Sequence, residues 1–225
     1  MRTRRFDTFD VMTQEAAALL KAHFEAEAEC PYAVMLSGGN TPLPTYRLLA
    51  RESLKPSPHL HLLYSDERLV PMHSPENNYG NTMDLVRALR LPEARILRVR
   101  TELPLQAAAD RYDHDIAEFL AQGGQIPLGL LGLGADGHTA SIFTADDAAF
   151  GEDRWAVAVP RPQKPDRVSI TPACLSRVQQ VVFIATGVDK ASIVKRFKRE
   201  PLSTPAGQAV AGVRHVELWH TQDAS

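Results

Sequence analysis

The sequence predicts an α/β fold, with a mainly parallel β-sheet flanked by helices in a single domain over residues 1–225. Short apolar runs alternate with longer amphipathic segments, which is typical of strands joined by crossover helices. The 225 residues are 44% hydrophobic and 23% charged, so the chain can bury one substantial core. Glycine-rich or charged segments follow several apolar runs directly. Because such sheets bind ligands at the carboxyl ends of their strands, we expect the site there.

The apolar runs predict strands, in chain order, at Ala33–Leu36, Leu60–Tyr64, Arg95–Val99, Leu128–Leu131, Trp155–Val159, Arg167–Ile170, Val181–Ala185 and His215–Trp219. The amphipathic segments predict helices at Thr13–Ala28, Leu43–Arg51, Tyr79–Leu89, Leu105–Gln122 and Lys190–Lys198. In the fourth helix, Ala108, Tyr112, Ile116 and Phe119 recur every three to four residues and form one apolar face. Val70–Asn78 and the proline-rich Pro160–Pro165 are expected to be loops within the domain.

Composition argues against several classes of protein. The 25 Lys and Arg residues balance 27 Asp and Glu residues, for a formal net charge of −2, whereas a nucleic-acid-binding protein carries a clustered basic excess. Cys30 and Cys174 form no CxxC motif, so we expect reduced thiols. The N-terminal MRTRRFDTFD leads into no apolar signal-peptide core, and no apolar run approaches the ~20 residues of a membrane helix. We therefore expect a soluble, cytoplasmic protein without nucleic-acid or membrane partners.

The first segment that could carry chemistry reads SGGNTP over residues 37–42, directly after a predicted strand. Its two glycines let the backbone approach a ligand closely, Thr41 can cap a helix, and Pro42 suits the first helical position. Free amides in such a turn suit an anion. An ordinary turn between a strand and a helix explains the same residues equally well, because short glycine motifs match by chance.

The second segment reads YSDERLVP over residues 64–71, and NNYG follows at residues 77–80. Asp66, Glu67 and Arg68 come immediately after an apolar strand. The guanidinium of Arg68 could fork onto a phosphate or carboxylate, and a carboxylate could order polar partners. Taken alone, these residues slightly favour a solvated strand end.

The third segment, LGLGADGHTASIF over residues 131–143, is the most informative. Its glycines permit a tight turn that brings His138 to the carboxyl end of a buried strand, and a short helix is expected next. Histidine suits proton transfer near neutral pH, although a capped turn histidine is the alternative. The glycines also match GxGxxG, but that dinucleotide motif normally lies on the first strand, with an acidic residue ~20 residues later. We do not expect a dinucleotide cofactor.

The fourth pair of segments reads RVSIT over residues 167–171 and TGVDKA over residues 186–191. Each places one cation beside a strand, Arg167 at its start and Lys190 after its end, at a helix entrance. Either residue alone is better explained as surface charge. Together they could supply the positive charge that a phosphate needs.

Other patterns of catalytic or metal-binding residues are missing from the sequence. His59 and His61 share a strand face, but no HExxH motif or Cys/His cluster accompanies them, so we expect no metal site. There is no GxSxG elbow for a serine nucleophile, and neither cysteine lies in a nucleophile motif.

Taken in order, SGGNTP, DERLVP with NNYG, GLGADGHTASIF, RVSIT and TGVDKA resemble the signature blocks of the 6-phosphogluconolactonase family. They span the chain from Ser37 to Lys190. DGHTAS after GxG, combined with DERxVP upstream, is the specific part of the resemblance. The family belongs to a wider group of Rossmann-like α/β proteins that includes glucosamine-6-phosphate deaminases. The resemblance implies a Rossmann-like domain that needs no metal and no organic cofactor.

The resemblance also implies a reaction, the hydrolysis of 6-phospho-D-glucono-1,5-lactone to 6-phospho-D-gluconate in the pentose phosphate pathway. His138 matches the family's general base, and Asp66 and Arg68 match active-site positions on the second loop. We expect Asp136 to hold the turn or to orient His138. Positions that grip the sugar phosphate match Gly38, Gly39, Asn40, Thr41, Arg167 and Lys190. The expected partner is this small phosphorylated lactone, bound to a monomer or a weak homo-oligomer.

Two other functions stay open. Glucosamine-6-phosphate deaminase/isomerases resemble the chain at the glycine turn, the second-loop Asp and DGH, but they carry a catalytic Glu where this chain has Phe143. A non-catalytic sugar-phosphate-binding module would share the fold; such modules are usually joined to a helix-turn-helix, for which the residues before the first strand leave little room. Asn40, Asn77 and Thr144 depart from the lactonase pattern and remove no group that the chemistry requires.

Overall fold

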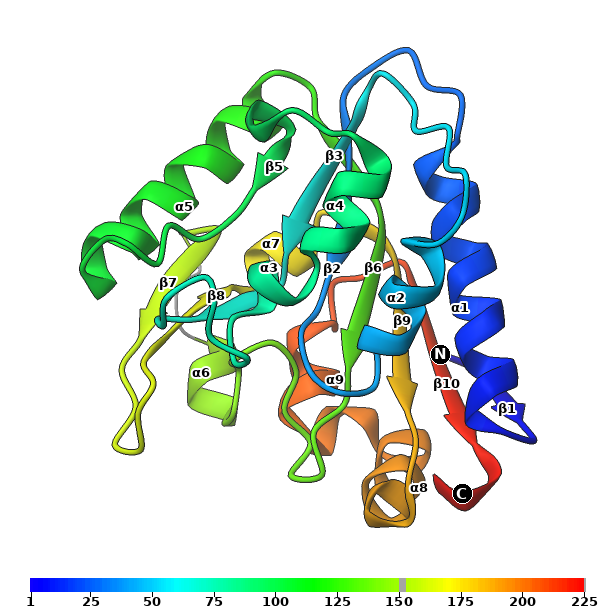
Figure 1. Cartoon of the computed structure of the whole chain (residues 1–225). Coiled ribbons are helices and arrows are strands. Elements are labelled where there is room, and N and C mark those ends of the chain that lie inside the picture. Colours follow the sequence, from blue (N-terminus) through cyan, green and yellow to red (C-terminus); the bar gives the residue numbers. More distant parts are fainter. Residues whose placement is uncertain (150–152, 225) are drawn as a thin grey trace.

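The structure is a computed structural model that describes residues 1–149 and 153–224. Over these residues, the main sheet consists of parallel strands in the spatial order β1-β10-β9-β6-β2-β3-β5 (Figure 1). Their bounds are β1 Arg2–Phe6, β2 Tyr32–Leu36, β3 Leu60–Tyr64, β5 Ile96–Leu97, β6 Gln125–Gly132, β9 Val178–Ala185 and β10 His215–Thr221. The predicted α/β class with a mainly parallel sheet flanked by helices is therefore confirmed.

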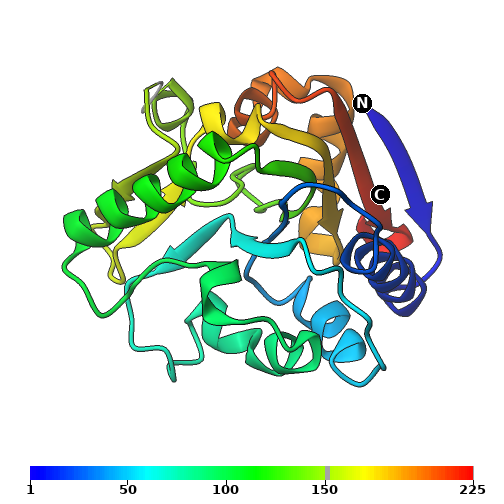
Figure 2. The same cartoon turned by 90° about the horizontal axis from the view of Figure 1, so that it is seen from above.

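Helices cover both faces of the sheet, as Figure 2 shows from above. Alternate side chains of β2 point to opposite faces, so Ala33 and Met35 join one core cluster while Val34 and Leu36 join the other. The first cluster packs under α5 Leu105–Ala121, α7 Pro172–Leu175, α8 Ala191–Arg199 and α9 Pro205–Ala209. The second packs under α1 Phe9–Phe24, α2 Leu43–Leu49, α3 Asn78–Asn81 and α4 Met83–Leu89.

The strand order changes direction between β2 and β6. From β2 the chain moves outward through β3 and β5, whereas from β6 it moves the other way through β9 and β10. Connections that diverge in this way leave a crevice at the carboxyl ends of the two central strands, where open α/β sheets bind ligands. In Figure 1 this is the lower end of the sheet, toward which the arrows point.

A small antiparallel sheet stands beside this end, in the order β4-β8-β7. Its strands are β4 Asp66–Arg68, β7 Ala156–Val159 and β8 Arg167–Ile170. β4 follows β3 after a single residue, and its register pairs Asp66 with Ser169 and Arg68 with Arg167. Two segments about a hundred residues apart in the sequence therefore place their cations side by side.

The predicted strands and helices are all present; the strands Leu60–Tyr64 and Arg167–Ile170 have the predicted bounds, and the ends of the other elements are shifted. The predicted helix Thr13–Ala28 starts earlier, at Phe9, because the Thr8 side chain accepts a hydrogen bond from the N–H of Val11 and caps it. The predicted strand Arg95–Val99 shortens to β5, since Arg95 ends a 3₁₀ turn, η1 Glu93–Arg95.

Several elements differ from the prediction. The predicted helix Tyr79–Leu89 is divided at Thr82, whose hydroxyl donates to the carbonyl of Tyr79 and lies 2.6 Å from the hydroxyl of Tyr64. The short helix expected directly after His138 is wrong in its position. The chain first makes a turn at residues 139–142, and α6 Ala145–Ala149 follows.

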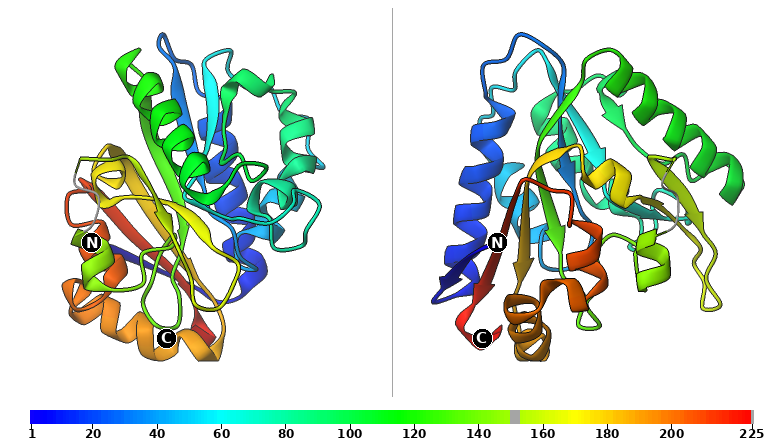
Figure 3. Two further views of the ribbon diagram at one scale, coloured as in Figure 1. Left: turned by 90° about the vertical axis from the view of Figure 1, so that its left-hand side faces the viewer. Right: turned by 180° about the vertical axis from the view of Figure 1, so that it is seen from behind.

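Strand β1 was missed because most of it is exposed and it carries no apolar alternation. Within the described residues it pairs only with β10, at the edge of the sheet. Because the pairing is parallel, the N-terminus lies beside the start of β10 and the C-terminus beyond its end, as Figure 3 shows. Strand β4 and helices α7 and α9 were missed because each is too short to show a period. The remaining 3₁₀ turns are η2 Val188–Lys190, η3 Pro201–Ser203 and η4 Gln222–Ala224. None of the helices in the described part of the chain has the length and apolar character for a bilayer crossing.

Candidate active site

A cavity of about 490 Å³ opens at the carboxyl ends of β2, β3, β6 and β9. Its lining includes nine of the ten residues predicted for the site: Gly38, Gly39, Asn40, Thr41, Asp66, Arg68, His138, Arg167 and Lys190. The tenth, Asp136, lies beside the cavity and is bonded to His138. The four segments singled out in the sequence thus converge on one site, and the Arg, Lys and Asp residues that they bring to its wall are three cations and two carboxylates.

The glycine turn forms one side of the cavity. The hydroxyl of Tyr46, on α2, donates to the carbonyl of Ser37 (2.9 Å) and accepts from its N–H (3.2 Å), which fixes the exit from β2. Gly39 has a φ of +98°, a conformation that favours glycine. Within the described residues, the N–H groups of Gly39, Asn40 and Thr41 donate no hydrogen bond, so they are available to an anion.

The predicted capping role of Thr41 is wrong. Helix α2 begins at Leu43 with Pro42 as its N-cap residue, and no side chain caps it. Pro42 therefore stands just before the helix instead of in its first position. The turn keeps its glycine geometry, and Thr41 lines the cavity.

Asp66 is 5% exposed and holds the floor of the site through several contacts. One oxygen, Oδ2, accepts from the hydroxyl of Ser141 at 2.7 Å and lies 3.6 Å from Nη1 of Arg167. The other, Oδ1, accepts from the amide of Asn78 and from the hydroxyl of Ser65, both at 3.3 Å. Charge-assisted bonds of this kind keep the carboxylate in one orientation.

Glu67, between the two predicted site residues of β4, is buried and points away from the cavity lining. Its carboxylate accepts three backbone N–H groups, from Arg68 (2.8 Å), Asn78 (2.7 Å) and Tyr79 (2.8 Å). Burial raises the pKa of Glu67 to about 7, although these hydrogen bonds oppose the shift. The Glu67 carboxylate thus connects β4 to the first residues of α3, at the two ends of the loop between them.

His138 and Asp136 form a hydrogen-bonded pair at the tip of the third segment. Nδ1 of His138 lies 2.5 Å from Oδ1 of Asp136, which also accepts the N–H of His138 at 3.2 Å. Partial burial acts to raise the pKa of Asp136, but the bonds from His138 outweigh it and the pKa is lowered. An ionised Asp136 only accepts hydrogen bonds, so it places the proton of a neutral His138 on Nδ1 and leaves Nε2 able to accept a proton.

Gly134 and Gly137 in this turn are each required for a different structural reason. A Cβ on Gly134 would lie 2.2 Å from Nδ1 of His138 and 2.5 Å from Oδ1 of Asp136, so only glycine leaves room for the pair. Gly137 has a φ of +90°. The N–H of Gly134 donates to the carbonyl of His138 at 2.8 Å, which closes the turn.

The ring of Phe143 packs against that of His138, with ring centroids 4.7 Å apart and the planes tilted by 41°. The guanidinium of Arg161, on the loop between β7 and β8, lies 3.9 Å from the centre of the Phe143 ring, and that of Arg167 lies 5.5 Å away. The position that carries a glutamate in glucosamine-6-phosphate deaminase/isomerases is thus occupied by an apolar ring that contacts His138 and lies close to two cations.

The two cations predicted to act together line the same cavity. Burial lowers the pKa of Arg167, with Asp66 opposing and the charges of Arg68 and Arg161 reinforcing the shift. A guanidinium nevertheless stays charged in proteins. Lys190 ends η2 and is the N-cap residue of α8, so its position at a helix entrance is confirmed.

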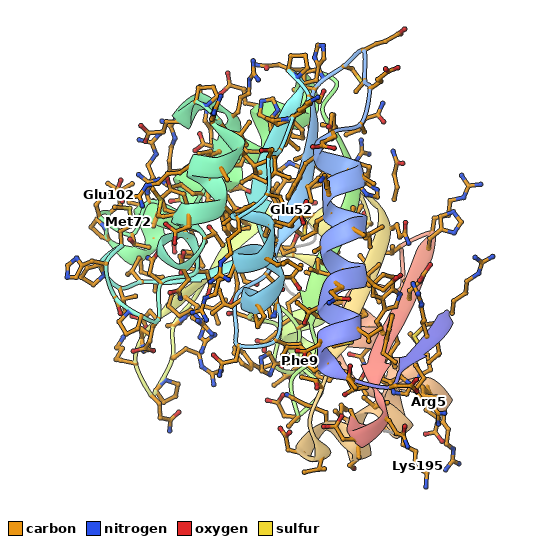
Figure 4. The ribbon with its side chains drawn as sticks, turned by 45° about the vertical axis from the view of Figure 1, so that its right-hand side comes forward. Arg5, Phe9, Glu52, Met72, Glu102 and Lys195 are labelled. Atoms are coloured by element: carbon orange, nitrogen blue, oxygen red, sulfur yellow. The ribbon has the colours of Figure 1, made fainter. Side chains whose placement is uncertain are left out.

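Sequence reasoning missed several residues of the site. Phe9, labelled in Figure 4 at the first turn of α1, lines the cavity together with Thr186 and Asp189. Ser141 and Asn78 bond to Asp66 from behind the cavity wall. Both stand inside the noted blocks GLGADGHTASIF and NNYG, so a signal was present, but nothing in the sequence indicated their partner. No cluster of three or more potential metal ligands occurs among residues 1–149 and 153–224.

Comparison with known proteins identifies the relatives of this chain. A family model described as glucosamine-6-phosphate isomerases/6-phosphogluconolactonase matches residues 7–219. A 6-phosphogluconolactonase of Homo sapiens is 32% identical over 96% of this chain and 85% of that protein. One from Chlamydia pneumoniae is 34% identical over 72% of this chain and 63% of its own length.

A solved structure agrees with these sequence matches. The crystal structure of a 6-phosphogluconolactonase from Thermotoga maritima has a TM-score of 0.79 and 27% identity, and the superposition covers 98% of each chain. The resemblance found in the motifs is confirmed, and with it the prediction that the chain is an enzyme of this kind.

Proposed function

This chain belongs to the family of glucosamine-6-phosphate isomerases and 6-phosphogluconolactonases, and on that premise we propose that it hydrolyses 6-phospho-D-glucono-1,5-lactone to 6-phospho-D-gluconate. The observation that carries the proposal is the His138–Asp136 pair at one side of a cavity whose other walls hold the Gly38–Thr41 turn, Arg167 and Lys190. We also propose that residues 1–225 act as one domain, since both core clusters share one sheet.

The first chemical step is the attack of water on the lactone carbonyl. Nε2 of His138 takes one proton from the water while the water oxygen bonds to the carbonyl carbon, and negative charge develops on the carbonyl oxygen. Asp136, bonded to Nδ1, stabilises the imidazolium that forms. A base of this kind contributes a factor of roughly 10²–10⁴ in rate.

The second step opens the ring. The carbonyl re-forms as the bond from the carbonyl carbon to the ring oxygen breaks, and the imidazolium returns its proton to that oxygen as it leaves. The product is an open-chain hydroxy acid, and His138 is neutral again. His138 therefore supplies the proton that the leaving ring oxygen needs, and no second proton donor is required.

The phosphate provides the binding energy that positions the carbonyl. We assign it to the unpaired amides of the Gly38–Thr41 turn, with Arg167 and Lys190 supplying positive charge. Arg68 lies opposite Arg167 in the small sheet and is a candidate to stabilise the oxyanion. Asp66 holds Arg167 at 3.6 Å and so sets the direction of the guanidinium.

The test is hydrolysis of the lactone generated in situ, with the spontaneous rate subtracted because the lactone also opens unaided in water. The proposal predicts a protein-dependent rate that His138→Ala lowers by roughly 10²–10⁴-fold, with affinity for 6-phosphogluconate retained. Arg167→Ala and Lys190→Ala should instead raise KM.

Two results would refute this function. A wild-type protein without lactonase activity that releases ammonia from glucosamine 6-phosphate would be a deaminase. One that binds sugar phosphates without turnover would be a binding module. Equal turnover by wild type and His138→Ala would remove His138 from the role of base.

A further inference from the structure

Asn78 is a buried polar residue just behind the wall of the cavity. It begins α3, after the loop that leaves β4, and it is 2% exposed. Although it stands outside the cavity lining, it contacts three residues of that lining, which come from two separate segments of the chain. The proposed reaction assigns it no task.

The side-chain amide of Asn78 uses both of its polar atoms. Nδ2 donates to the carbonyl of Asp66 at 2.8 Å and to its Oδ1 at 3.3 Å. Oδ1 accepts from Nη1 of Arg68 at 2.9 Å. The uncharged amide of Asn78 thus binds Asp66 and Arg68, two residues of β4 with opposite charges, at the same time.

The same side chain occupies the space beside Gly38. A Cβ built on Gly38 would lie 1.8 Å from Oδ1 of Asn78, and Cγ and Nδ2 would lie at 2.1 and 2.5 Å. The three nearest atoms all belong to the Asn78 amide, so the glycine turn rests directly on it. Gly38 therefore has to be a glycine because Asn78 is there.

The backbone of Asn78 is itself held in place. Its N–H donates to Oε1 of the buried Glu67 at 2.7 Å, and the N–H of Tyr79 donates to Oε2 at 2.8 Å. Because Glu67 also accepts the N–H of Arg68, one carboxylate ties β4 to the start of α3. The amide of Asn78 accordingly projects from a fixed point.

We propose that Asn78 is a positioning residue, which holds the Gly38 turn, Asp66 and Arg68 at fixed distances from one another across the cavity. The inference rests on the proposed hydrolysis, because it supposes that the Gly38 turn and Arg68 bind the substrate and that Asp66 orients Arg167. Only an amide of this length offers a donor to Asp66 and an acceptor to Arg68 without adding charge.

This arrangement keeps the charge of Arg68 available to a ligand. Asp66 pairs with Arg167 at 3.6 Å, whereas Nη1 of Arg68 is bonded to the carbonyl of Glu76 (3.0 Å) and to Asn78. Over the described residues, no carboxylate pairs with Arg68. Without the intervening amide, Asp66 and Arg68 are free to pair with each other, and the charge of Arg68 is then no longer available to a ligand.

The test is a double-mutant cycle with Gly38→Ala and Asn78→Ala, measured as kcat and KM of lactone hydrolysis. Each single substitution should raise KM and lower kcat/KM by about 10- to 100-fold, since each displaces or removes the amide that orients charged groups. In the double variant, the methyl group of Ala fits the space that the amide has left. Gly38→Ala should then cost less than about threefold.

Controls separate positioning from loss of fold. Asn81→Ala removes an asparagine of the same helix whose amide donates to the carbonyl of Pro75 at 2.8 Å, and both kinetic constants should stay within about twofold of wild type. A purely structural role for Asn78 would reduce the active fraction, which lowers kcat and leaves KM unchanged. Additive costs in the cycle, or an unchanged KM in Asn78→Ala, would overturn the proposal.

A crystal structure of Asn78→Ala tests the inference without activity. The proposal expects the guanidinium of Arg68 to leave its place and pair with Asp66; a guanidinium that keeps its position would refute it. A wild-type protein that does not hydrolyse the lactone refutes the proposed function instead, and this structural outcome then still decides the role of Asn78.

Discussion

Asp136→Asn is the substitution that examines the histidine pair most directly. It keeps the size of the side chain but removes the charge that holds the proton of His138 on Nδ1, 2.5 Å away. A hydrogen bond to a charged group contributes about 1.5–3 kcal/mol. Because the two side chains are 30% and 59% exposed, we take the lower part of that range, about 1.5–2 kcal/mol, or roughly a 10- to 30-fold fall in kcat.

The assay is steady-state hydrolysis of the lactone, corrected for spontaneous opening, together with calorimetric titration of 6-phosphogluconate. KM and product affinity should change little, since Asp136 stands outside the cavity lining. Asp146→Asn, an exposed carboxylate on α6, is the matched control and should behave as wild type. If Asp136→Asn and Asp136→Ala both retain kcat within twofold of wild type, Asp136 does not orient the base and the reasoning fails.

Three further outcomes are expected. Gly134→Ala should lower kcat by more than about tenfold while the protein stays folded, because its Cβ would lie 2.2 Å from Nδ1 of His138. Gly129→Ala, in the preceding strand β6, has an ordinary nearest contact of 3.4 Å and should keep kcat. Burial raises the pKa of Glu67 from 4.5 to about 7. Between these two pH values the folded chain binds more protons than the unfolded chain. The free energy of unfolding therefore falls as pH rises through this range, by at most about 1.4 kcal/mol per pH unit. Glu67→Gln should flatten this slope in urea denaturation, and an equal slope in both proteins would contradict the assignment. Tyr112→Phe should lower the free energy of unfolding by about 1–3 kcal/mol, because the hydroxyl bonds both the N–H and the carbonyl of the last residue of β3; a change below about 0.5 kcal/mol would show that water replaces it.

The predictable parts of the fold are those with a repeating pattern. Helix α5 was found because Tyr112, Ile116 and Phe119 recur at the helical period and are buried on one face. Strand β1 could not be found this way, because its exposed residues carry no alternation and only pairing with β10 makes them a strand. The division of the predicted helix 79–89 likewise depends on a distant hydroxyl, that of Tyr64.

The predictable parts of the site are those in which neighbouring residues form the geometry. The glycines around His138 and the turn after β2 are local features, so the sequence indicated them. The contact of Ser141 with Asp66 joins positions 75 residues apart, and that of Asn78 with Gly38 joins two loops. Such contacts leave no periodic signal, because neither residue alone differs from an ordinary polar residue of a loop.

The sequence by itself determined the class of fold, the four segments with chemistry and the identity of the residues in them. These follow from backbone preferences and from hydrophobic spacing, which act between residues close in the chain. Only the tertiary structure decided that Arg68 and Arg167 lie opposite each other, that Asp66 pairs with Arg167, and that an amide from α3 supports the glycine turn. These relations depend on how the strands are ordered and on which side chains share a buried space, and that order is settled by packing across the whole core.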